Sequence, residues 1–350
     1  MNEHQVHEMA LRVIKDMGGA FIMALGYIGD RLNLFKAMAG AGPMTSVELA
    51  RKTKLNERYV REWLRAMVAA EYLEYDPSTD KYVMTEEQAF VLANEDSPMF
   101  VGGGFHFTTP SLQNVPKIME AFRHGGGISY SEIGEEIPAA IERFFGPGYR
   151  NLLAKEWLAA VPGLTAKLEK GASVADVGCG CGQSSVAIAK AFPKSRVLAI
   201  DYHAPSIERA RKLAMENHVD NVQFIQAPAD QLPCDRKYDL VCSFDCIHDM
   251  VNPRATLRAI RGALAPKGVY IWSEPNASDK AHLNRNPIGR TFHAISPLHC
   301  MTVSLAHNGE GLGTVIGEEG ARALAREAGF SHFEKLPIQN PLNQFFALCA

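Results

Sequence analysis

The residues with the clearest chemical potential follow a short apolar run that is typical of a buried strand, residues 173–177. Gly178, Gly180 and Gly182 come next at alternate positions, and residues 184–192 then have the composition of a helix. Glycines permit a tight turn with positive φ and let a ligand lie against the backbone. The first N–H groups of a helix favour a polar ligand, so this stretch predicts a binding loop for a nucleotide-like molecule.

A second apolar run, residues 238–244, leads to a histidine beside a carboxylate, His248-Asp249. A neutral imidazole can take a proton from a hydroxyl or thiol, because the pKa of histidine lies close to neutral pH. Glu274 ends a later strand-like run and can orient the imidazole. His248, Asp249 and Glu274 are therefore the catalytic candidates. The alternative is a histidine that only packs against a ligand or caps a helix, and the sequence leaves both open.

From residue 171 onward, strand-like and helix-like segments alternate along the chain. The expected strands are residues 173–177, 196–201, 222–226, 238–244, 268–274, 333–336 and 344–348. This alternation predicts an α/β fold with a doubly wound sheet and crossover helices. Ligands of such sheets bind at the carboxyl ends of the strands, near the point where the strand order reverses.

The spacing of two acids narrows the choice of ligand. Asp201 ends the second strand, 25 residues after Asp176, where a carboxylate can accept hydrogen bonds from ribose hydroxyls. Both NAD and S-adenosylmethionine (SAM) fit this position. A dinucleotide site favours glycine at position 183, which is Gln183 here, and Asp176 would repel a pyrophosphate. The pattern therefore favours SAM, with an NAD-linked oxidoreductase as an alternative.

Several motifs together resemble the class I SAM-dependent methyltransferases. They are residues 176–182, Asp201, Gln231-Leu232-Pro233, residues 238–241 and residues 264–269. The resemblance implies a Rossmann-like, seven-stranded methyltransferase sheet over residues 171–350 and a methyl group transferred to a small-molecule acceptor. Oxygen or sulfur is the expected acceptor atom and nitrogen is also possible. The element around His248 resembles the one that carries the catalytic histidine in plant O-methyltransferases.

The same resemblance implies which residues bind SAM. They are Asp176, Gly178, Cys179, Gly180, Gly182, Asp201, Tyr202, Ala229, Asp230, Phe244 and Asp245. Pro228 stands where many members of the family have an aspartate for the adenine amino group. The backbone N–H of Ala229 and the carboxylate of Asp230 are the expected replacements. Methyl transfer can also proceed by proximity and desolvation alone, which leaves the role of a general base open.

The N-terminal residues 1–110 predict a mainly α-helical winged-helix domain. Helical segments near residues 45–50 and 57–69 precede two short strands near residues 72–75 and 81–85. Arg58, Arg61 and Arg65 would lie on a recognition helix, which makes a SAM-binding transcriptional regulator the alternative function. Glutamates interrupt these arginines, so we expect a dimerisation module instead. Apolar residues at helical spacing between residues 5 and 25 predict a homodimer face.

A helical bridge, residues 111–170, and an insertion at about residues 275–316 complete the expected organisation. Long insertions at strand ends usually form lids or binding loops. Side chains there and in the N-terminal part are candidates for binding the methyl acceptor: Tyr27, His106, Tyr130, Tyr149, Arg290, His293 and His299. No carboxylate lies at a spacing from His293 and His299 that is typical of metal ligands, so no metal site is predicted.

Composition excludes some classes of function. The net charge of −3 argues against broad nucleic-acid binding. Seven cysteines with no Cys-x-x-Cys pair argue against a disulfide framework and a zinc ribbon. No apolar run reaches the length of a membrane span, and the N-terminus does not have the form of a signal peptide. We therefore expect a cytoplasmic enzyme with no membrane partner and with no nucleic acid as its partner.

Overall fold

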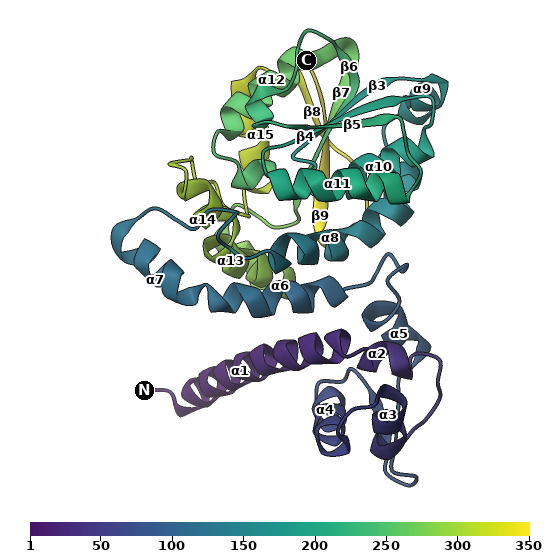
Figure 1. The fold of residues 1–350 in the computed structure, drawn as a ribbon. Coiled ribbons are helices and arrows are strands. Elements are labelled where there is room, and N and C mark those ends of the chain that lie inside the picture. Colours follow the sequence, from purple (N-terminus) through teal and green to yellow (C-terminus); the bar gives the residue numbers. More distant parts are fainter. The chain divides into compact units, whose positions relative to one another are not determined.

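A computed structural model describes all 350 residues of the chain. The chain divides into two compact units (Figure 1). The first contains residues 1–112 and 143–147, and the second contains residues 113–142 and 148–350. The segment expected as a bridge, residues 111–170, is therefore shared between the two units. No helix of the chain has both the length and the apolar composition that crossing a lipid bilayer requires.

The first unit is mainly helical and contains the expected winged helix. Its elements are α1 (Glu3–Arg31), α2 (Leu34–Met38), α3 (Ser46–Thr53), α4 (Glu57–Ala69), β1 (Glu74–Asp76), β2 (Lys81–Val83), α5 (Glu86–Leu92) and α6 (Gly102–Gln113). Thr45 and Glu48 form a capping box that begins α3, and the side chain of Asn56 caps α4. The strands β1 and β2 pair as an antiparallel hairpin.

The surface of α4 does not concentrate positive charge. Each of its arginines lies beside a glutamate of the same helix, as the pairs Arg58–Glu62 at 2.6 Å, Arg61–Glu57 at 2.7 Å and Arg65–Glu62 at 3.2 Å. Binding to a DNA backbone depends on cations that are available to phosphates. The helix that would read DNA is therefore largely neutralised by its own acids.

A network of charged side chains lies inside the first unit. Both terminal nitrogens of Arg143 donate to the carboxylate of Asp30, at 2.5 and 2.9 Å. His106 Nε2 lies 2.5 Å from the same carboxylate, and Arg143 also donates to Glu95 at 3.2 Å. Burial opposes ionisation of Asp30, but the hydrogen bonds from His106 and Arg143 outweigh it and lower its pKa to about 2.

We predict that Asp30→Asn destabilises the first unit by about 3 kcal/mol at pH 7, because Arg143 would lose its buried partner. The folded-state pKa of Asp30 lies below the ordinary value of 3.8. Its contribution is therefore complete above about pH 4 and is lost as the pH falls towards 2. Urea unfolding across this range measures the difference between the proteins. Glu71→Gln, at an exposed carboxylate, should change stability by less than about 0.5 kcal/mol. A difference between wild type and Asp30→Asn that does not shrink with acid would contradict this account.

The second unit contains the alternating strands and helices. Its elements are α7 (Val115–His124), most of α8 (Glu136–Gly148), η1 (Tyr149–Trp157), α9 (Leu164–Lys170), β3 (Ser173–Val177), α10 (Gln183–Ala191), β4 (Arg196–Asp201), α11 (Ala204–Glu216), β5 (Val222–Gln226), η2 (Ala229–Gln231), β6 (Tyr238–Phe244), η3 (Ile247–Asp249), α12 (Pro253–Ala263), β7 (Leu264–Pro275), η4 (Ala281–Asn284), α13 (Pro287–Leu298), α14 (Cys300–Leu305), α15 (Gly317–Ala328), β8 (His332–Lys335) and β9 (Asn343–Cys349). The expected doubly wound sheet of seven strands is confirmed, in the order β5-β4-β3-β6-β7-β9-β8. The first five strands in this order pair in parallel, and β9 pairs antiparallel with both β7 and β8.

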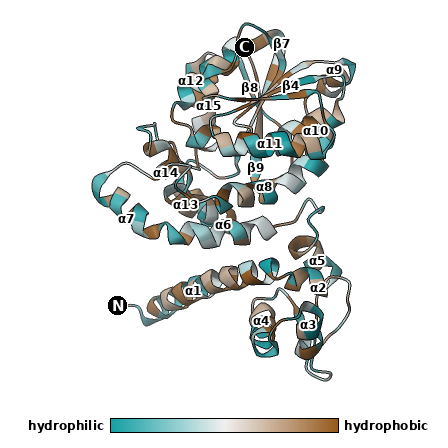
Figure 2. Cartoon of the chain, viewed as in Figure 1, coloured by the Kyte–Doolittle hydropathy of each residue, from teal (hydrophilic) through white to brown (hydrophobic).

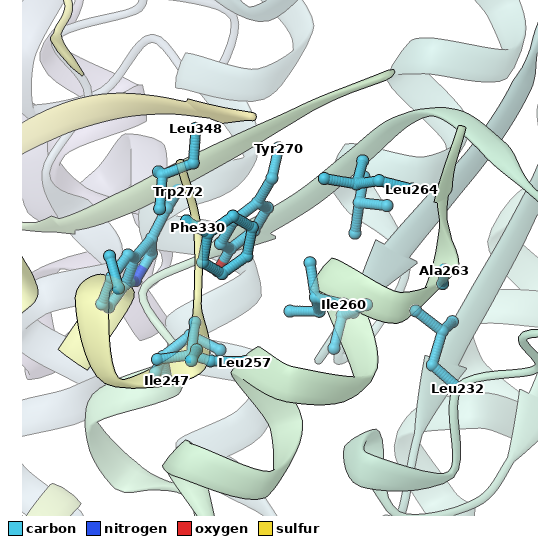
Figure 3. Packing of buried hydrophobic residues seen from close by; sticks show 14 of the residues in the cluster. Leu232, Ile247, Leu257, Ile260, Ala263, Leu264, Tyr270, Trp272, Phe330 and Leu348 are labelled. Atoms are coloured by element: carbon cyan, nitrogen blue, oxygen red, sulfur yellow. The ribbon is translucent and has the colours of Figure 1, made fainter. Parts of the chain in front are cut away.

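Helices bury both faces of this sheet. On one face, α12 and α15 cover a cluster that includes Tyr270 and Trp272 of β7, whose rings stack at 6.0 Å between centroids (Figure 3). Ile247 of η3 belongs to the same cluster, so apolar packing fixes the backbone beside His248. On the other face, η1, α9 and α10 cover a second cluster. The strands are therefore buried on both sides, which is why they read as continuous apolar runs.

Glycine and proline are typical of helix ends, so Gly146-Pro147-Gly148 predicts a break between two helices, but the structure has no break there. Instead, α8 runs through these residues and continues directly into η1, whose backbone is π-helical. A proline lacks the N–H that an α-helix needs from its interior residues, and a π-helical stretch shifts the hydrogen-bond pattern locally. The two helices that the sequence predicts separately are therefore continuous in the structure.

Candidate active site

The glycine turn joins β3 to α10 at the carboxyl edge of the sheet. Gly178, Gly180 and Gly182 have φ values of +72°, +50° and +80°. A Cβ atom on Gly178 would lie 2.6 Å from Cys246 Sγ, and one on Gly182 would lie 2.7 Å from Ala210 Cβ. A Cβ atom on Gly180 would meet nothing within 4 Å. Two of the glycines are thus needed for packing, whereas Gly180 borders open space in which a ligand can lie.

Two carboxylates flank this turn. Asp201, at the end of β4, accepts hydrogen bonds from the N–H groups of Gly180 and His203, both at 2.9 Å. Asp176, in β3, accepts from Ser184 Oγ at 2.6 Å and from Ser185 Oγ at 2.5 Å. Burial raises the pKa of Asp176 to about 6, although these hydroxyls oppose the rise. The first carboxylate orients the loop, and the second ties β3 to the start of α10.

Two more acids follow β6. Asp245 has a left-handed backbone, with φ of +50°, and its N–H donates to the Ser273 carbonyl at 3.0 Å. Burial, together with the negative charge of Glu274, raises the pKa of Asp245 to about 7. Burial raises the pKa of Asp249 to about 7 as well, against the opposing effect of His248. Negative charge at this edge of the sheet therefore exceeds the positive charge that the chain supplies.

His248 is held by a buried carboxylate. Its Nδ1 lies 2.6 Å from Oε2 of Glu274, and both side chains are almost fully buried. The other carboxylate oxygen, Oε1, accepts from the indole N–H of Trp272 at 2.7 Å. Burial by itself would lower the pKa of His248, but the charge of Glu274 and hydrogen bonds with Glu274 and Cys300 raise it well above its ordinary value. The imidazole therefore has one orientation and readily holds a proton.

Aromatic side chains surround the two strand ends. The ring of Tyr130 lies 4.9 Å from that of His203, 5.9 Å from that of His299 and 6.3 Å from that of Tyr202. Burial, aided by the charge of His248, lowers the pKa of His299 to about 4, so this imidazole is neutral. Tyr130 thus connects His203 and Tyr202, which follow Asp201, with the segment from the insertion.

The other acceptor candidates are not all brought together. Tyr149 meets Phe244 edge to face, with ring centroids 5.5 Å apart, so it lies beside β6. Tyr27 and His106 contact each other at 4.8 Å within the first unit. Of the remaining two, Arg290 and His293 lie exposed on α13, where His293 Nε2 is 2.9 Å from Asn284 Nδ2. The sequence gives little basis for telling the candidates near the strand ends from the others, because residues that line a binding cleft have no fixed spacing along a chain.

The remaining candidates lie around the glycine turn and the end of β5. Cys179 is buried beside the first glycine of the turn, and Ala229 and Asp230 form the short helix η2. Two residues that sequence reasoning missed also contact the site: Asn343 of β9, which donates to Asp245, and Cys300 of α14, which lies beside His248. Neither belongs to a motif, and both come from segments far from their partners in the sequence. No group of three or more metal-ligating side chains is present.

Two parts of the chain match known protein families. Residues 168–310 match the family described as a methyltransferase domain, and residues 20–94 match the Rv2258c-like winged HTH domain. The chain therefore contains a methyltransferase domain of the class I SAM-dependent type, preceded by a winged-helix domain. The ubiquinone biosynthesis O-methyltransferase of Bordetella avium is 27% identical over 201 residues, which is 57% of this chain and 77% of that protein. Its counterpart in Rickettsia felis is 33% identical over 110 residues, 31% of this chain and 44% of that protein.

Solved structures share the fold of this methyltransferase along almost its whole length. Mitomycin 7-O-methyltransferase has a TM-score of 0.72 at 19% identity and covers 99% of this chain and 100% of its own. Human N-acetylserotonin methyltransferase, solved in complex with SAM, has a TM-score of 0.68 at 18% identity and covers 97% of both chains. The expected arrangement of a winged-helix domain followed by a methyltransferase domain is confirmed. None of the matches described here is to a transcriptional regulator.

The glycine turn of this methyltransferase gives a matched test. Gly182→Ala should destabilise the enzyme by about 3 kcal/mol, because the methyl group meets Ala210 and φ is positive. Gly180→Ala should cost only about 1 kcal/mol of backbone strain, yet it should weaken binding of S-adenosylhomocysteine. Chemical unfolding and isothermal titration calorimetry measure the two effects. Equal stability losses, or unchanged binding by Gly180→Ala, would show that the open space is not a ligand site.

Proposed function

We propose that this enzyme transfers the methyl group of SAM to a hydroxyl or thiol of a small molecule, and that His248 takes the proton. An amine is the alternative acceptor. The observation that carries the proposal is the buried contact of 2.6 Å between His248 and Glu274 at the end of β6, next to β3 in the sheet. O-methyltransferases among the relatives and structural neighbours support an oxygen acceptor.

The residues at the carboxyl edge of the sheet fit SAM. SAM carries a sulfonium and an ammonium. The edge holds acids whose pKa values are raised, first because burial opposes their ionisation and further by the charge of neighbouring acids. Gly180 borders open space at the turn, as the approach of a ligand to the backbone requires. Asp201 keeps carboxylate lone pairs beyond its two backbone contacts. The site thus has both the charge and the room for this ligand.

We assign the parts of SAM to residues by their place in the site. Asp201 would accept hydrogen bonds from the ribose, and Tyr202 would lie against the adenine. The N–H of Ala229 and the carboxylate of Asp230, in η2, would meet the adenine edge. The glycine turn with Cys179, together with Asp176, Phe244 and Asp245, would enclose the methionine part. SAM supplies a methyl group activated by its bond to a positively charged sulfur.

His248 must be neutral to accept a proton from the acceptor. Glu274 fixes its Nδ1 side, which leaves Nε2 as the atom that takes the proton. The same carboxylate stabilises the imidazolium that results. Because the pKa of His248 lies above its ordinary value, the neutral form becomes abundant only at correspondingly higher pH. Asp249 and Glu274 act in this scheme by setting the charge around the imidazole.

We predict that His248→Ala lowers kcat by about 10²- to 10³-fold, as the loss of a general base does, and changes SAM affinity by less than about threefold. For the wild type, kcat should rise with pH through a value above 6.5, since deprotonation creates the base. Glu274→Gln should move this rise to lower pH, because the carboxylate no longer stabilises the imidazolium. Initial-rate measurements between pH 5.5 and 9, at saturating SAM, give these profiles.

His248→Asn, which keeps a polar side chain, controls for damage to the fold. If both variants bind SAM and retain wild-type kcat at every pH, His248 is not the base. The enzyme would then act by positioning an acceptor that ionises without help. If the wild type does not bind SAM at all, the proposed function itself fails.

The N-terminal helix supports a proposal that the enzyme is a homodimer. Figure 2 shows hydrophobic residues along much of α1. Its exposed apolar side chains are Val6, Met9, Leu11, Val13, Ile14, Met17, Phe21 and Ile28. A single chain leaves this apolar surface in water, which is unfavourable at about 25 cal/mol for each Å². A second copy of the same helix would bury this surface. The enzyme would then have two kinds of partner, a second copy of itself and the methyl acceptor.

We predict that the double substitution Met17→Glu and Phe21→Glu converts a dimer into a monomer, because it places two charges on the apolar face. Light scattering coupled to gel filtration measures the mass. Lys15→Glu, which changes the charge of the same exposed helix and removes no apolar side chain, should leave the mass unchanged. A monomeric wild type at micromolar concentration would contradict the proposal.

A further inference from the structure

Asn343 contacts the acid that follows β6 through its amide nitrogen, which lies within hydrogen-bond distance of both carboxylate oxygens. Asn343 Nδ2 lies 2.6 Å from Oδ1 and 2.7 Å from Oδ2 of Asp245, although 98 positions separate the two residues in the sequence. The asparagine is buried, with 5% of its surface exposed. Each carboxylate oxygen of Asp245 can accept more than one hydrogen bond, so the contact leaves lone pairs for a ligand.

The geometry of the contact is fixed from both sides. Asn343 begins β9 opposite Pro275 of β7, and its own N–H donates to Asn340 Oδ1 at 3.0 Å. Asp245 has a left-handed backbone, with φ of +50°, which non-glycine residues adopt only where their surroundings hold it. Its N–H is bonded to Ser273 of β7, the same strand that pairs with β9. The turn before β9 therefore places the amide, and β7 places the carboxylate.

Asn343 does not neutralise Asp245. An amide is a neutral donor, and the other ionisable groups that act on Asp245 are Glu274 of β7, with Asp249 and His248 of η3. Tyr149 of η1 is also close enough to feel its charge. Two of these groups are acids, and the one cation, His248, is already paired with Glu274. A carboxylate that is held so firmly and left so short of positive charge is suited to a cationic ligand.

We propose that Asn343 is a positioning residue for the methyl donor, which holds the Asp245 carboxylate ionised and directed at the cationic part of SAM. The inference rests on the proposed function, because it takes SAM as the ligand at this edge. It assigns a role to the C-terminal strand, which carries no motif. Asp245 is the group that meets the donor, and Asn343 acts through it.

A double-mutant cycle tests the inference, with SAM binding measured by isothermal titration calorimetry. Asn343→Ala should weaken SAM binding about tenfold, since hydrogen bonds to charged groups have effects of this size. Asp245→Asn should weaken it at least as much. Once Asp245 has been replaced, Asn343→Ala should add less than about twofold, because the amide would no longer have a charge to hold. Additive losses in the double variant would overturn the proposal.

The pH dependence of binding separates positioning from a general structural role. SAM affinity of the wild type should rise with pH through about 7, where Asp245 ionises. Asn343→Ala should move this rise to higher pH, because the lost hydrogen bonds favoured the carboxylate. Asp245→Asn should remove the part of the rise that depends on this residue and leave only what the other titrating groups of the site, Asp176, Asp249 and His248, contribute. An unchanged profile for Asn343→Ala would refute the inference.

Asn221→Ala is the matched control. Asn221 is also an amide within the second unit, but its Nδ2 donates only to the carbonyls of Ala189, Phe192 and Ser195. Its loss should lower stability while the pH profile of SAM binding stays that of the wild type. Should the wild type bind SAM and the cycle be additive, only the role of Asn343 fails. Should the wild type not bind SAM, the proposed function fails first.

Discussion

The structure depends on a concentration of buried and partly buried carboxylates at the carboxyl edge of the sheet. Asp176, Asp201, Asp245 and Asp249 lie in or directly after three strands, and Glu274 lies in a fourth. Burying carboxylates is unfavourable unless hydrogen bonds or cations compensate. Serine hydroxyls, backbone N–H groups, an asparagine amide and one imidazole supply part of that compensation. These groups do not compensate the negative charge fully. The uncompensated part is the physical reason why this edge suits a ligand that carries positive charge.

The scaffold around this edge is apolar and tightly packed, and it determines where each polar group points. The rings of Tyr270 and Trp272 stack on one side of β7, while the indole N–H of Trp272 binds the carboxylate that orients His248. Ile247, directly before that histidine, is buried in the same core. The core and the site therefore share residues. A change in core packing would be transmitted to the imidazole of His248, because a close-packed interior has low compressibility.

Two parts of the chain outside the motifs complete the arrangement. The segment after α7 carries Tyr130, and the N–H of Ile128 in the same segment donates to Thr302 of α14 at 2.9 Å. This contact holds the tyrosine near His203 and His299. At the other side, β9 brings Asn343 to Asp245. Both contributions follow from chain topology: crossover connections return distant segments to the same edge of the sheet.

The sequence alone predicted the methyltransferase domain, the order of the strands along the chain and the residues of the glycine turn. These are local properties, since the turn needs glycines at fixed spacing and a strand buried on both faces reads as an apolar run. Only the tertiary structure decided which side chains meet. The sequence indicated that Glu274 could orient His248, and the structure confirms their contact across 26 positions, but no spacing rule encodes the contact of Asn343 with Asp245 across 98 positions. The structure also joined α8 to a π-helix through Pro147, and it brought Tyr27 and His106 into ring contact within the first unit. Side-chain pairing depends on how the sheet is wound, which local composition does not specify.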